Sequence, residues 1–372
     1  MKKVKLGEVT INIDNRRKPL NNLQRSEKSF SKKYPYCGAN NIIDFIDEYI
    51  FDENEEILCI AEDGGNWGKD EECTYVMNEK CWVNNHAHVL KMKTGVDINY
   101  IKLILDYLDL TPYITGSTRG KLTKSSLDKI EINLPNYHTQ ISISKKISDI
   151  QKLITKKEEQ IQKYNELVKS RFNEMFGDPV FNEMRWRRCK LKDISIGKLA
   201  YGSGASAIDF SGLRYIRITD IDECGNLKLD KKSPSHYDEK YLLNTGDILF
   251  ARSGATVGKT FLYSKEKYGP ALYAGYLIRL IPNLSLVNPV FVYHFTNTKF
   301  YNDFIAKVQN TVAQPNINAK QYSELDFILP PLSLQNEFAD FVAQVDKSQL
   351  AIQKSLEELE TLKKSLMQEY FG

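Results

Sequence analysis

Two stretches of the chain repeat apolar residues at the alternating three- and four-residue spacing of a heptad seam. Neither stretch contains proline beyond its first residue or an internal glycine, and each leads to a glycine, Gly177 or Gly372, where helices often end. This spacing predicts two long helices, over residues 136–177 and 331–372, each with a narrow apolar stripe that needs a partner. The seam positions are Ile143, Ile147, Ile150, Ile154, Ile161, Tyr164 and Val168 in the first stretch, and Phe338, Val342, Val345, Ile352, Leu356, Leu359 and Leu366 in the second.

We expect the two helices to pack on each other as an antiparallel coiled coil, with Lys157 and Gln349 as polar interruptions of the seam. The alternative is that each helix packs on its own globular region. The apolar residues near the helix ends are expected to be exposed, either capping the coiled coil or binding a partner's helices. They are Phe172, Met175, Phe176, Met367, Tyr370 and Phe371.

The chain also repeats itself once, and the order of the matching blocks is kept. The matching blocks are KLGEV (5–9) and KLKDI (190–194), EILCIAEDGGNWGK (56–69) and DILFARSGATVGK (247–259), AHVLKM (87–92) and GYLIRL (275–280), GKLTKSSLDKIEINLP (120–135) and PNINAKQYSELDFILP (315–330), and RFNEMFG (171–177) and LMQEYFG (366–372). The last two pairs of blocks are each 195 residues apart, and the same offset aligns Gln140 with Gln335.

The repeat predicts a mixed α/β (α+β) protein with two globular domains related by a pseudo-two-fold axis and separated by the helix pair. We expect domain 1 at 1–135, the first spacer helix at 136–177, domain 2 at 178–330 and the second spacer helix at 331–372. A plain duplicated globular protein is the simpler alternative.

Composition narrows the class of protein. With 372 residues, 42% of them hydrophobic and 27% charged, the chain can form two cores and is neither mainly disordered nor collagen-like. It has no apolar run of membrane-spanning length and no signal-peptide core at its start, so we expect a cytoplasmic protein. The six cysteines lack CxxC spacing, and we expect reduced thiols. The net charge of +3 permits an acidic partner without demanding one.

No enzyme motif fits the globular regions. Residues 253–260 resemble a phosphate-binding loop, but Gly254 and Gly258 enclose three residues where that loop needs four. His86 and His88 alternate along an expected strand and share a face. Because we see no third ligand nearby, we expect them to be surface or DNA-contact residues rather than metal ligands.

The same regions are rich in side chains that read nucleic acid: Arg and Lys bind guanine edges and phosphates, Asn and Gln pair with adenine, and Ser and Thr serve either. We expect DNA contacts from Arg16, Arg17, Tyr36, Asn40, Asn41, Asn66, Trp67, Lys69, His86, His88, Ser117, Thr118, Arg119 and Lys121 in domain 1. In domain 2 we expect them from Tyr201, Ser203, Arg217, Arg252, Ser253, Thr256, Lys259, Tyr273, Gln309, Thr311, Gln314 and Asn316. Taken singly, each of these could also be an ordinary surface side chain.

Over its whole length, the chain resembles the DNA-specificity (S) subunit of type I restriction–modification systems. The similar segments are YPYCGAN (34–40), ILCIAEDG (57–64), GDILFARSG (246–254), LPPLSLQNEF (329–338) and LETLKKSLMQ (359–368). The resemblance implies two target-recognition domains that each bind one half of a bipartite site in double-stranded DNA, with the two helices as a spacer.

The resemblance also implies partners and a division of labour. Two methyltransferase (M) subunits would supply S-adenosylmethionine and the adenine methylation, and two restriction (R) subunits that use ATP and Mg would be optional further partners. No catalytic residue, cofactor or metal is expected in this chain. The alternatives are a specificity subunit of another restriction system or of a stand-alone methyltransferase, a nucleotide-using enzyme built on residues 253–260, and a coiled-coil protein without DNA contact.

Overall fold

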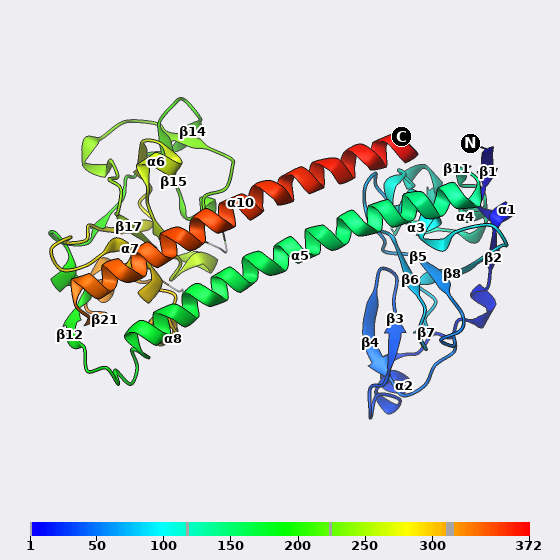
Figure 1. Cartoon of the computed structure of the whole chain (residues 1–372), viewed down its shortest axis with the longest axis horizontal. Helices are drawn as coiled ribbons and strands as arrows, with labels where there is room; N and C mark the ends of the chain where they lie inside the picture. Colours follow the sequence, from blue (N-terminus) through cyan, green and yellow to red (C-terminus); the bar gives the residue numbers. More distant parts are fainter. Residues whose placement is uncertain (1, 117–118, 223–224, 310–315) are drawn as a thin grey trace. The chain divides into compact units, whose positions relative to one another are not determined.

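The computed structural model describes residues 2–116, 119–222, 225–309 and 316–372. The chain forms two compact units, one of Met1–Glu158 with Lys354–Gly372 and one of Glu159–Gln353. The division runs through both long helices, so each unit contains one globular domain and part of each helix (Figure 1). Domain 1 below means residues 1–135, and domain 2 means residues 178–330.

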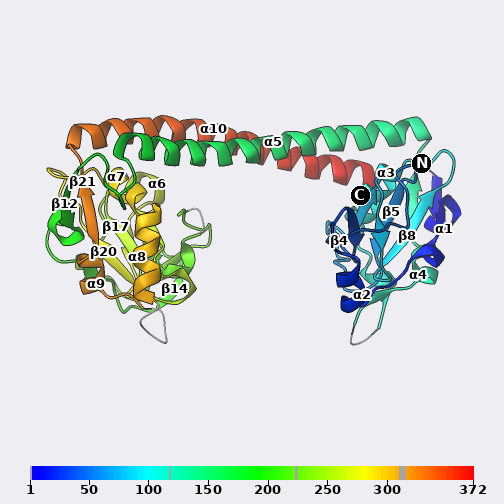
Figure 2. The same cartoon turned by 90° about the horizontal axis from the view of Figure 1, so that it is seen from below.

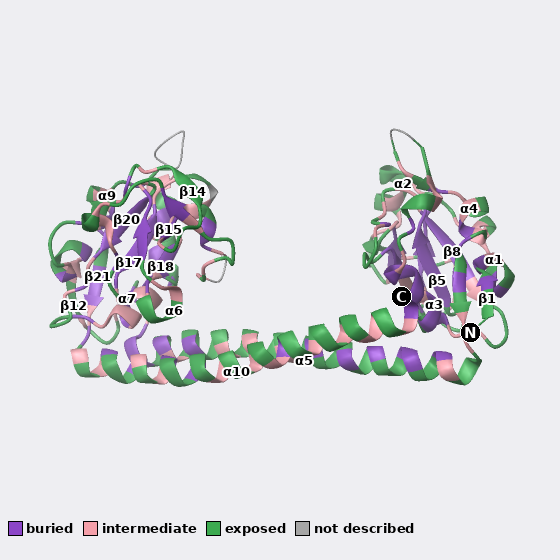
Figure 3. Cartoon of the chain, turned by 90° about the horizontal axis from the view of Figure 1, so that it is seen from above, coloured by how far each residue is buried: buried purple, intermediate pink, exposed green. Residues whose placement is uncertain are grey.

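Domain 1 is built on a four-stranded antiparallel sheet in the order β2-β8-β5-β6. All five residues of the central strand β5 (Ile57–Ala61) are buried, as expected of a continuous apolar run (Figure 3). Helix α3 (Ile98–Tyr107) packs its apolar side into the same core, together with Leu58, Ile60 and Leu90 of the sheet. The other sheet strands are β2 (Thr10–Asn12), β6 (Thr74–Met77) and β8 (Ala87–Met92).

Smaller elements complete domain 1. Strand β1 pairs with β11, β9 with β10, and β3 lies between β4 and β7. Their bounds are β1 Lys2–Lys5, β3 Tyr34–Cys37, β4 Ile42–Ile46, β7 Trp82–Val83, β9 Ile114–Thr115, β10 Lys121–Leu122 and β11 Glu131–Leu134; the short helices are α1 Leu6–Val9, η1 Asp14–Arg16, α2 Asn22–Glu27, η2 Thr111–Tyr113 and α4 Lys124–Asp128.

Domain 2 has the same plan. Its four-stranded sheet has the order β13-β20-β17-β18, again with a wholly buried central strand, β17 (Ile248–Ala251). Strands β12 and β21 pair as β1 and β11 do (Figure 2). The strands are β12 Arg187–Lys190, β13 Ala200–Tyr201, β14 Ala207–Asp209, β15 Arg214–Ile216, β16 Lys232–Pro234, β18 Thr260–Leu262, β19 Ala271–Tyr273, β20 Leu277–Leu280 and β21 Asp326–Leu329; the helices are η3 Leu191–Ile194, η4 Ile218–Asp220, η5 Glu239–Tyr241, η6 Gly254–Thr256, α6 Lys265–Tyr268, α7 Pro289–Phe295, α8 Lys299–Gln309 and α9 Ala319–Ser323.

The internal repeat is therefore a repeat of topology as well as of sequence. Besides its four-stranded sheet, each domain has a separate sheet with a parallel strand pair. The pair is β3 with β7 in domain 1 and β15 with β19 in domain 2. The blocks matched in the sequence fall on equivalent elements, such as β8 with β20 and α4 with α9. The expected mixed α/β fold with two globular domains is confirmed.

The two long helices are α5 (Tyr137–Phe176) and α10 (Leu332–Phe371). They run antiparallel in unit 1, because Gln151 pairs with Lys363 while Lys146 meets Tyr370 further along α10. The same holds in unit 2, where Arg171, beyond Asn165 on α5, pairs with Glu337, which precedes Gln349 on α10. All the predicted seam residues are buried or half-buried. The polar interruption Gln349 donates its side-chain amide to Asn165 Oδ1 at 2.8 Å.

A buried glutamine anchors the start of each long helix. Gln140 accepts from the backbone N–H of Asp97 at 2.9 Å and donates to the Pro135 carbonyl at 2.9 Å. Gln335 does the same with Asn288 at 2.9 Å and with the Pro330 carbonyl at 2.8 Å. The repeat preserves Gln140 and Gln335 because each one satisfies backbone groups where a helix leaves its domain.

The apolar ends of the long helices are not exposed, which corrects the sequence-based expectation. Phe172, Met175 and Phe176 of α5 lie in the core that also contains the sheet of domain 2. Phe371 of α10 lies in the core of domain 1, with Met367 and Tyr370 packed against it. The helices pack on each other as predicted, and in addition each begins at the domain of its own repeat and ends in the core of the other unit.

Candidate nucleic-acid interface

In domain 1, two predicted DNA-contact loops meet at the end of the central strand β5. The backbone N–H of Leu122 donates to the Glu62 carbonyl at 2.8 Å, and Asp63 forms an isolated bridge with Lys121. The N–H of Glu62 donates to the carbonyl of His86 at 2.9 Å. The loop after β5 and the loop before β10 thus form one continuous surface.

Domain 2 repeats this arrangement at the end of β17. The N–H of Ile317 donates to the Arg252 carbonyl at 2.8 Å, and Ser253 forms a bridge with Asn316. The N–H of Arg252 donates to the carbonyl of Tyr276 at 3.1 Å. The two loops therefore meet through the same backbone bonds in both domains, with Arg252 at the position that Glu62 holds in domain 1.

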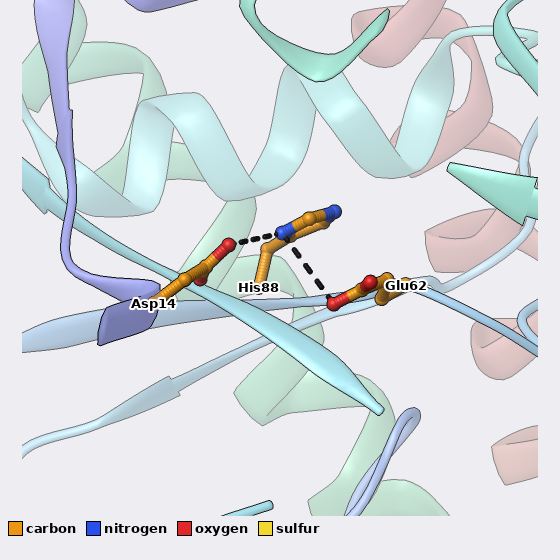
Figure 4. Close-up of side chains that lie close together, drawn as sticks. All are labelled: Asp14, Glu62 and His88. Atoms are coloured by element: carbon orange, nitrogen blue, oxygen red, sulfur yellow. Dashed lines mark hydrogen bonds and ion pairs between the residues drawn. The ribbon is translucent and has the colours of Figure 1, made fainter. Parts of the chain in front are cut away.

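A histidine lies buried beneath this surface in domain 1. His88 of β8 is 1% exposed, with Nδ1 2.6 Å from Asp14 Oδ2 and Nε2 2.7 Å from the Leu122 carbonyl oxygen (Figure 4). A carbonyl and a carboxylate both accept hydrogen bonds, so each ring nitrogen of His88 lies within hydrogen-bond distance of an acceptor. His88 therefore joins the sheet to the loop surface from inside.

Two carboxylates surround His88 and have cationic partners of their own. Burial opposes the charge of Asp14, but hydrogen bonds from His88 and neighbouring donors outweigh it and lower the pKa of Asp14. Burial likewise opposes the charge of Glu62, whose pKa is lowered by Lys121 Nζ at 2.8 Å and by the guanidinium of Arg17. Both carboxylates are thus held ionised inside a network of opposite charges.

These three groups have the spacing of metal ligands, which the sequence analysis did not foresee. One ligand atom each from Asp14, Glu62 and His88 lies within 4.8 Å of the others. Both nitrogens of His88 are already in hydrogen bonds, and Arg17 and Lys121 occupy the Glu62 carboxylate. A cation would have to displace these partners, so the donor set fits an internal ion network better than a metal site.

Several predicted contact residues of domain 1 are engaged inside the domain. Arg16 pairs with Glu55 and donates to the Ile50 carbonyl at 2.9 Å, and Asn40 donates to the Gly64 carbonyl at 3.1 Å. His86 is partly exposed beside Asp63, at 2.8 Å from Nδ1 to Oδ1. The exposed predicted residues of this domain are Asn40, Asn41, Asn66, Lys69, Arg119 and Lys121.

Five predicted contact side chains are buried, and for these the expected surface role is corrected. They are Tyr36, Trp67, His88, Ser203 and Tyr273, each at most 9% exposed. Trp67 donates its indole N–H to the Ala61 carbonyl, and the Tyr273 hydroxyl lies 3.4 Å from the Ala200 carbonyl. The rings of Tyr36, Trp67 and Tyr273 fill the core while their polar atoms serve internal bonds, so they support the surface from below.

In domain 2 the other predicted residues that the structure describes are exposed or partly exposed. Tyr201 is 41% exposed, and Arg217 is held by an ion pair with Asp220. Partly or fully exposed are Arg252, Ser253, Thr256, Lys259, Gln309 and Asn316. Ser117, Thr118, Thr311 and Gln314 lie outside the described residues.

The loop that resembles a nucleotide-binding loop has the wrong surroundings for that role. A phosphate-binding loop joins a strand to the first turn of a helix. Here residues 252–259 join β17 to the neighbouring antiparallel strand β18. The equivalent loop of domain 1 joins β5 to β6. This architecture argues against a nucleotide site in either loop.

Sequence reasoning missed the acidic partners in the surface. Asp14, Glu62 and Asp63 each bind a basic or histidine side chain that the sequence had marked for DNA. Asp14 is distant from Glu62 in sequence, and no spacing rule connects them. The repeat does contain a signal, because aligning the two loops places Glu62 opposite Arg252.

Fold and surface together define a protein with two copies of one α/β domain, each presenting a paired-loop surface. Residues 1–163 and 188–362 match the model of the type I restriction modification DNA specificity domain, and the chain belongs to this family. It is a specificity subunit of a type I restriction–modification system with two target-recognition domains, as the sequence resemblance implied.

Known relatives agree with this assignment. The chain is 26% identical to a Haemophilus influenzae protein named as a type I restriction enzyme specificity subunit, over 82% of either chain. It is 22% identical to the MjaVIII specificity subunit of Methanocaldococcus jannaschii, over 90% of this chain and 84% of that one.

Solved structures share the fold. The S subunit of a type I system from M. genitalium aligns with a TM-score of 0.65 at 14% identity, covering 100% of this chain and 96% of that one. A chain from a structural study of the assembly of a type I system aligns with a TM-score of 0.57 at 13% identity, covering 100% and 97%. Among the described residues, none of the helices is long and apolar enough to cross a membrane.

Proposed function

We propose that this specificity subunit reads a bipartite target in double-stranded DNA, one half through the loops of domain 1 and the other through those of domain 2. The observation that carries the proposal is the duplicated pairing of loops, through Glu62 and Leu122 in one domain and Arg252 and Ile317 in the other. Loops fixed on rigid sheets suit base recognition, because the strands hold the contacting side chains in place.

The contact residues in this proposal are the exposed members of the predicted set. In domain 1 they include Asn66, Lys69 and Arg119, and in domain 2 the partly exposed Arg252. The small net charge of +3 is compatible with this role, since base contacts specify a sequence even where partner subunits supply much of the phosphate binding.

In the proposal, the chain itself is not a catalyst. Two M subunits would bind S-adenosylmethionine and methylate adenine, and R subunits with ATP and Mg would add restriction. Two features of the chain support this. The loop that resembles a nucleotide-binding loop runs between antiparallel strands, and the side chains of Asp14, Glu62 and His88 are paired with groups of the protein itself.

Co-expression with a methyltransferase (M) subunit that co-purifies with this chain tests the proposal. The co-purified complex should methylate adenine in one bipartite motif, found by modification-sensitive sequencing of the host DNA. The chain alone, given S-adenosylmethionine and the same DNA, should transfer no methyl group. Methylation by the pure chain, or a complex whose motif has a single uninterrupted part, would contradict the proposal.

A further inference from the structure

The two domains place opposite charges at one equivalent position of their loop surfaces. Glu62 and Arg252 follow the central strands β5 and β17, and their backbones make the same pair of hydrogen bonds. In domain 1 both oxygens of the Glu62 carboxylate are paired, because Lys121 binds one of them at 2.8 Å and Arg17 binds the other. The side chain at the equivalent position of domain 2, Arg252, makes different contacts.

The guanidinium of Arg252 is held on two sides. Its central carbon lies over the ring of Tyr201, 4.7 Å from the ring centroid, which is the geometry of a cation–π contact. Its Nε donates to Asn316 Oδ1 at 3.2 Å. Asn316 is itself fixed by its backbone bridge to Ser253. The plane and the inner edge of the guanidinium are therefore set before any ligand arrives.

Tyr201 is also anchored at its far end. Its hydroxyl accepts a hydrogen bond from the backbone N–H of Ala319, the first residue of α9, at 3.0 Å. The next residue is Gly202, where a Cβ would lie 2.4 Å from the carbonyl oxygens of Tyr273 and Ala274. Only glycine permits that close approach, which fixes the chain directly after Tyr201.

The outer edge of Arg252 remains available. Among the residues that the structure describes, neither Nη atom of Arg252 has a hydrogen-bond or ion-pair partner. Both Nη groups present parallel N–H donors, the fork that binds O6 and N7 of guanine in the major groove. Holding a flexible side chain in its binding conformation reduces the entropy lost on binding.

From this geometry we infer that Tyr201 and Asn316 are positioning residues that prepare Arg252 to bind the major-groove edge of one guanine in the half-site read by domain 2. The inference rests on the proposed function and adds the base class and the residues that select it. It also assigns Tyr201 a supporting role, where the sequence suggested a direct DNA contact. The equivalent position in domain 1, held by Glu62 in its ion pairs, reads no base.

Four variants in the reconstituted methyltransferase complex test this, with the preference at each base pair of the motif as the readout. Arg252→Ala should lose about tenfold or more of the discrimination at one G·C pair. Tyr201→Leu and Asn316→Ala should lose part of it at the same pair. Tyr201→Phe, which keeps the ring under the guanidinium, should retain most of it. The other base pairs of the half-site read by domain 2 should be unchanged in all four, which reports correct folding of that domain, and the half-site read by domain 1 should be unchanged as well.

A double-mutant cycle separates positioning from a general structural effect. Once Arg252 is alanine, Tyr201→Leu should change the preference at that G·C pair no further, because its effect passes through the arginine. Tyr237→Leu is the matched control, since Tyr237 is exposed in the same domain and has no described side-chain partner. It should leave the pair unchanged.

Two outcomes would overturn the inference. If Arg252→Ala weakens binding equally for all sequences, the fork binds a phosphate and reads no base. If Tyr201→Leu acts equally with and without Arg252, Tyr201 does not position it. Either result leaves the bipartite motif in place, whereas a complex without any bipartite motif would contradict the proposed function itself.

Discussion

At the scale of single residues, His88 shows how the inside of domain 1 supports its loop surface. Replacing it with alanine leaves the Asp14 carboxylate and the Leu122 carbonyl without their buried partner. Asp14 keeps its ion pair with Arg17, but two buried hydrogen bonds and the packing of the ring are lost. His88→Ala should therefore lower the free energy of unfolding by about 2 kcal/mol or more. Urea unfolding of the full chain measures this.

His86 provides the matched control two residues away. Its side chain is 42% exposed and bonds only to Asp63. His86→Ala should therefore cost less than about 1 kcal/mol. Equal losses in the two variants would contradict the buried position of His88.

A second histidine gives unit 2 a defined dependence on pH. Burial lowers the pKa of His294 on α7 from 6.5 to about 4. The folded state thus keeps the ring neutral while the unfolded chain binds a proton below pH 6.5. Stability should fall as the pH drops from 6.5 to about 4, by at most about 3 kcal/mol, and this contribution should then level off.

His294→Phe tests that dependence, because phenylalanine can keep the edge contact with Phe338 without a titrating nitrogen. The variant should lose the part of the pH dependence that lies between 6.5 and 4, measured by urea unfolding at several pH values. His236, exposed in the same domain, is the control, and His236→Phe should keep that part. If both variants keep it, another group is responsible.

At the scale of elements, the seam and the buried strands could be predicted because each is a periodic pattern within a short window. The three- and four-residue spacing around Ile147 and Ile150 predicts the helix α5. The continuous apolar run at 57–61 is typical of a buried strand, and it forms β5. Whether the helix ends cap the coiled coil or pack into a domain core could not be predicted from such a pattern. Phe176 and Phe371 look alike in sequence whether they cap a coil or enter a core, and only the tertiary contacts decide.

The burial of the C-terminal helix end makes a strong prediction about domain 1. Phe371 is 5% exposed, and its ring lies 5.4 Å from that of Tyr100 and 5.9 Å from that of Tyr107. Phe371→Ala should destabilise domain 1 by about 3–5 kcal/mol through the cavity it leaves. Leu362 on the same helix is 47% exposed, so Leu362→Ala should cost less than about 1 kcal/mol.

Tryptophan fluorescence can follow this transition in domain 1 alone. Of the three tryptophans, Trp67 and Trp82 lie in domain 1 and Trp186 lies in the other unit. In a Trp186→Phe background, the fluorescence transition should move to lower urea for Phe371→Ala. An unmoved transition would mean that the helix end is not part of the domain 1 core.

The candidate site was only partly predictable for a related reason. Residue type marked Arg252 and Lys121 as possible DNA contacts, and both lie on the paired loops. Residue type could not show that Glu62 neutralises Lys121 while both Nη groups of Arg252 stay without a partner among the described residues. Those outcomes depend on side chains that come together only when strands from distant parts of the chain align.

At the scale of the whole molecule, the repeat gives both helices the same role in the proposed reading of DNA. Each has 40 residues and a seam in heptad register. We expect this helix length to set the gap between the two halves of the target. Inserting one heptad into both α5 and α10 keeps the seam and lengthens each helix by about 10 Å.

A helix pair that is longer by about 10 Å corresponds to roughly three base pairs of DNA. The variant complex should therefore methylate a motif with the same two halves and a gap that is longer by about three base pairs. Activity should be weaker, because three base pairs also turn the DNA by about a third of a helical turn. Inserting a heptad into α5 alone shifts one seam against the other and should abolish the complex. An active double insertion with the original gap would show that the helices do not set the spacing.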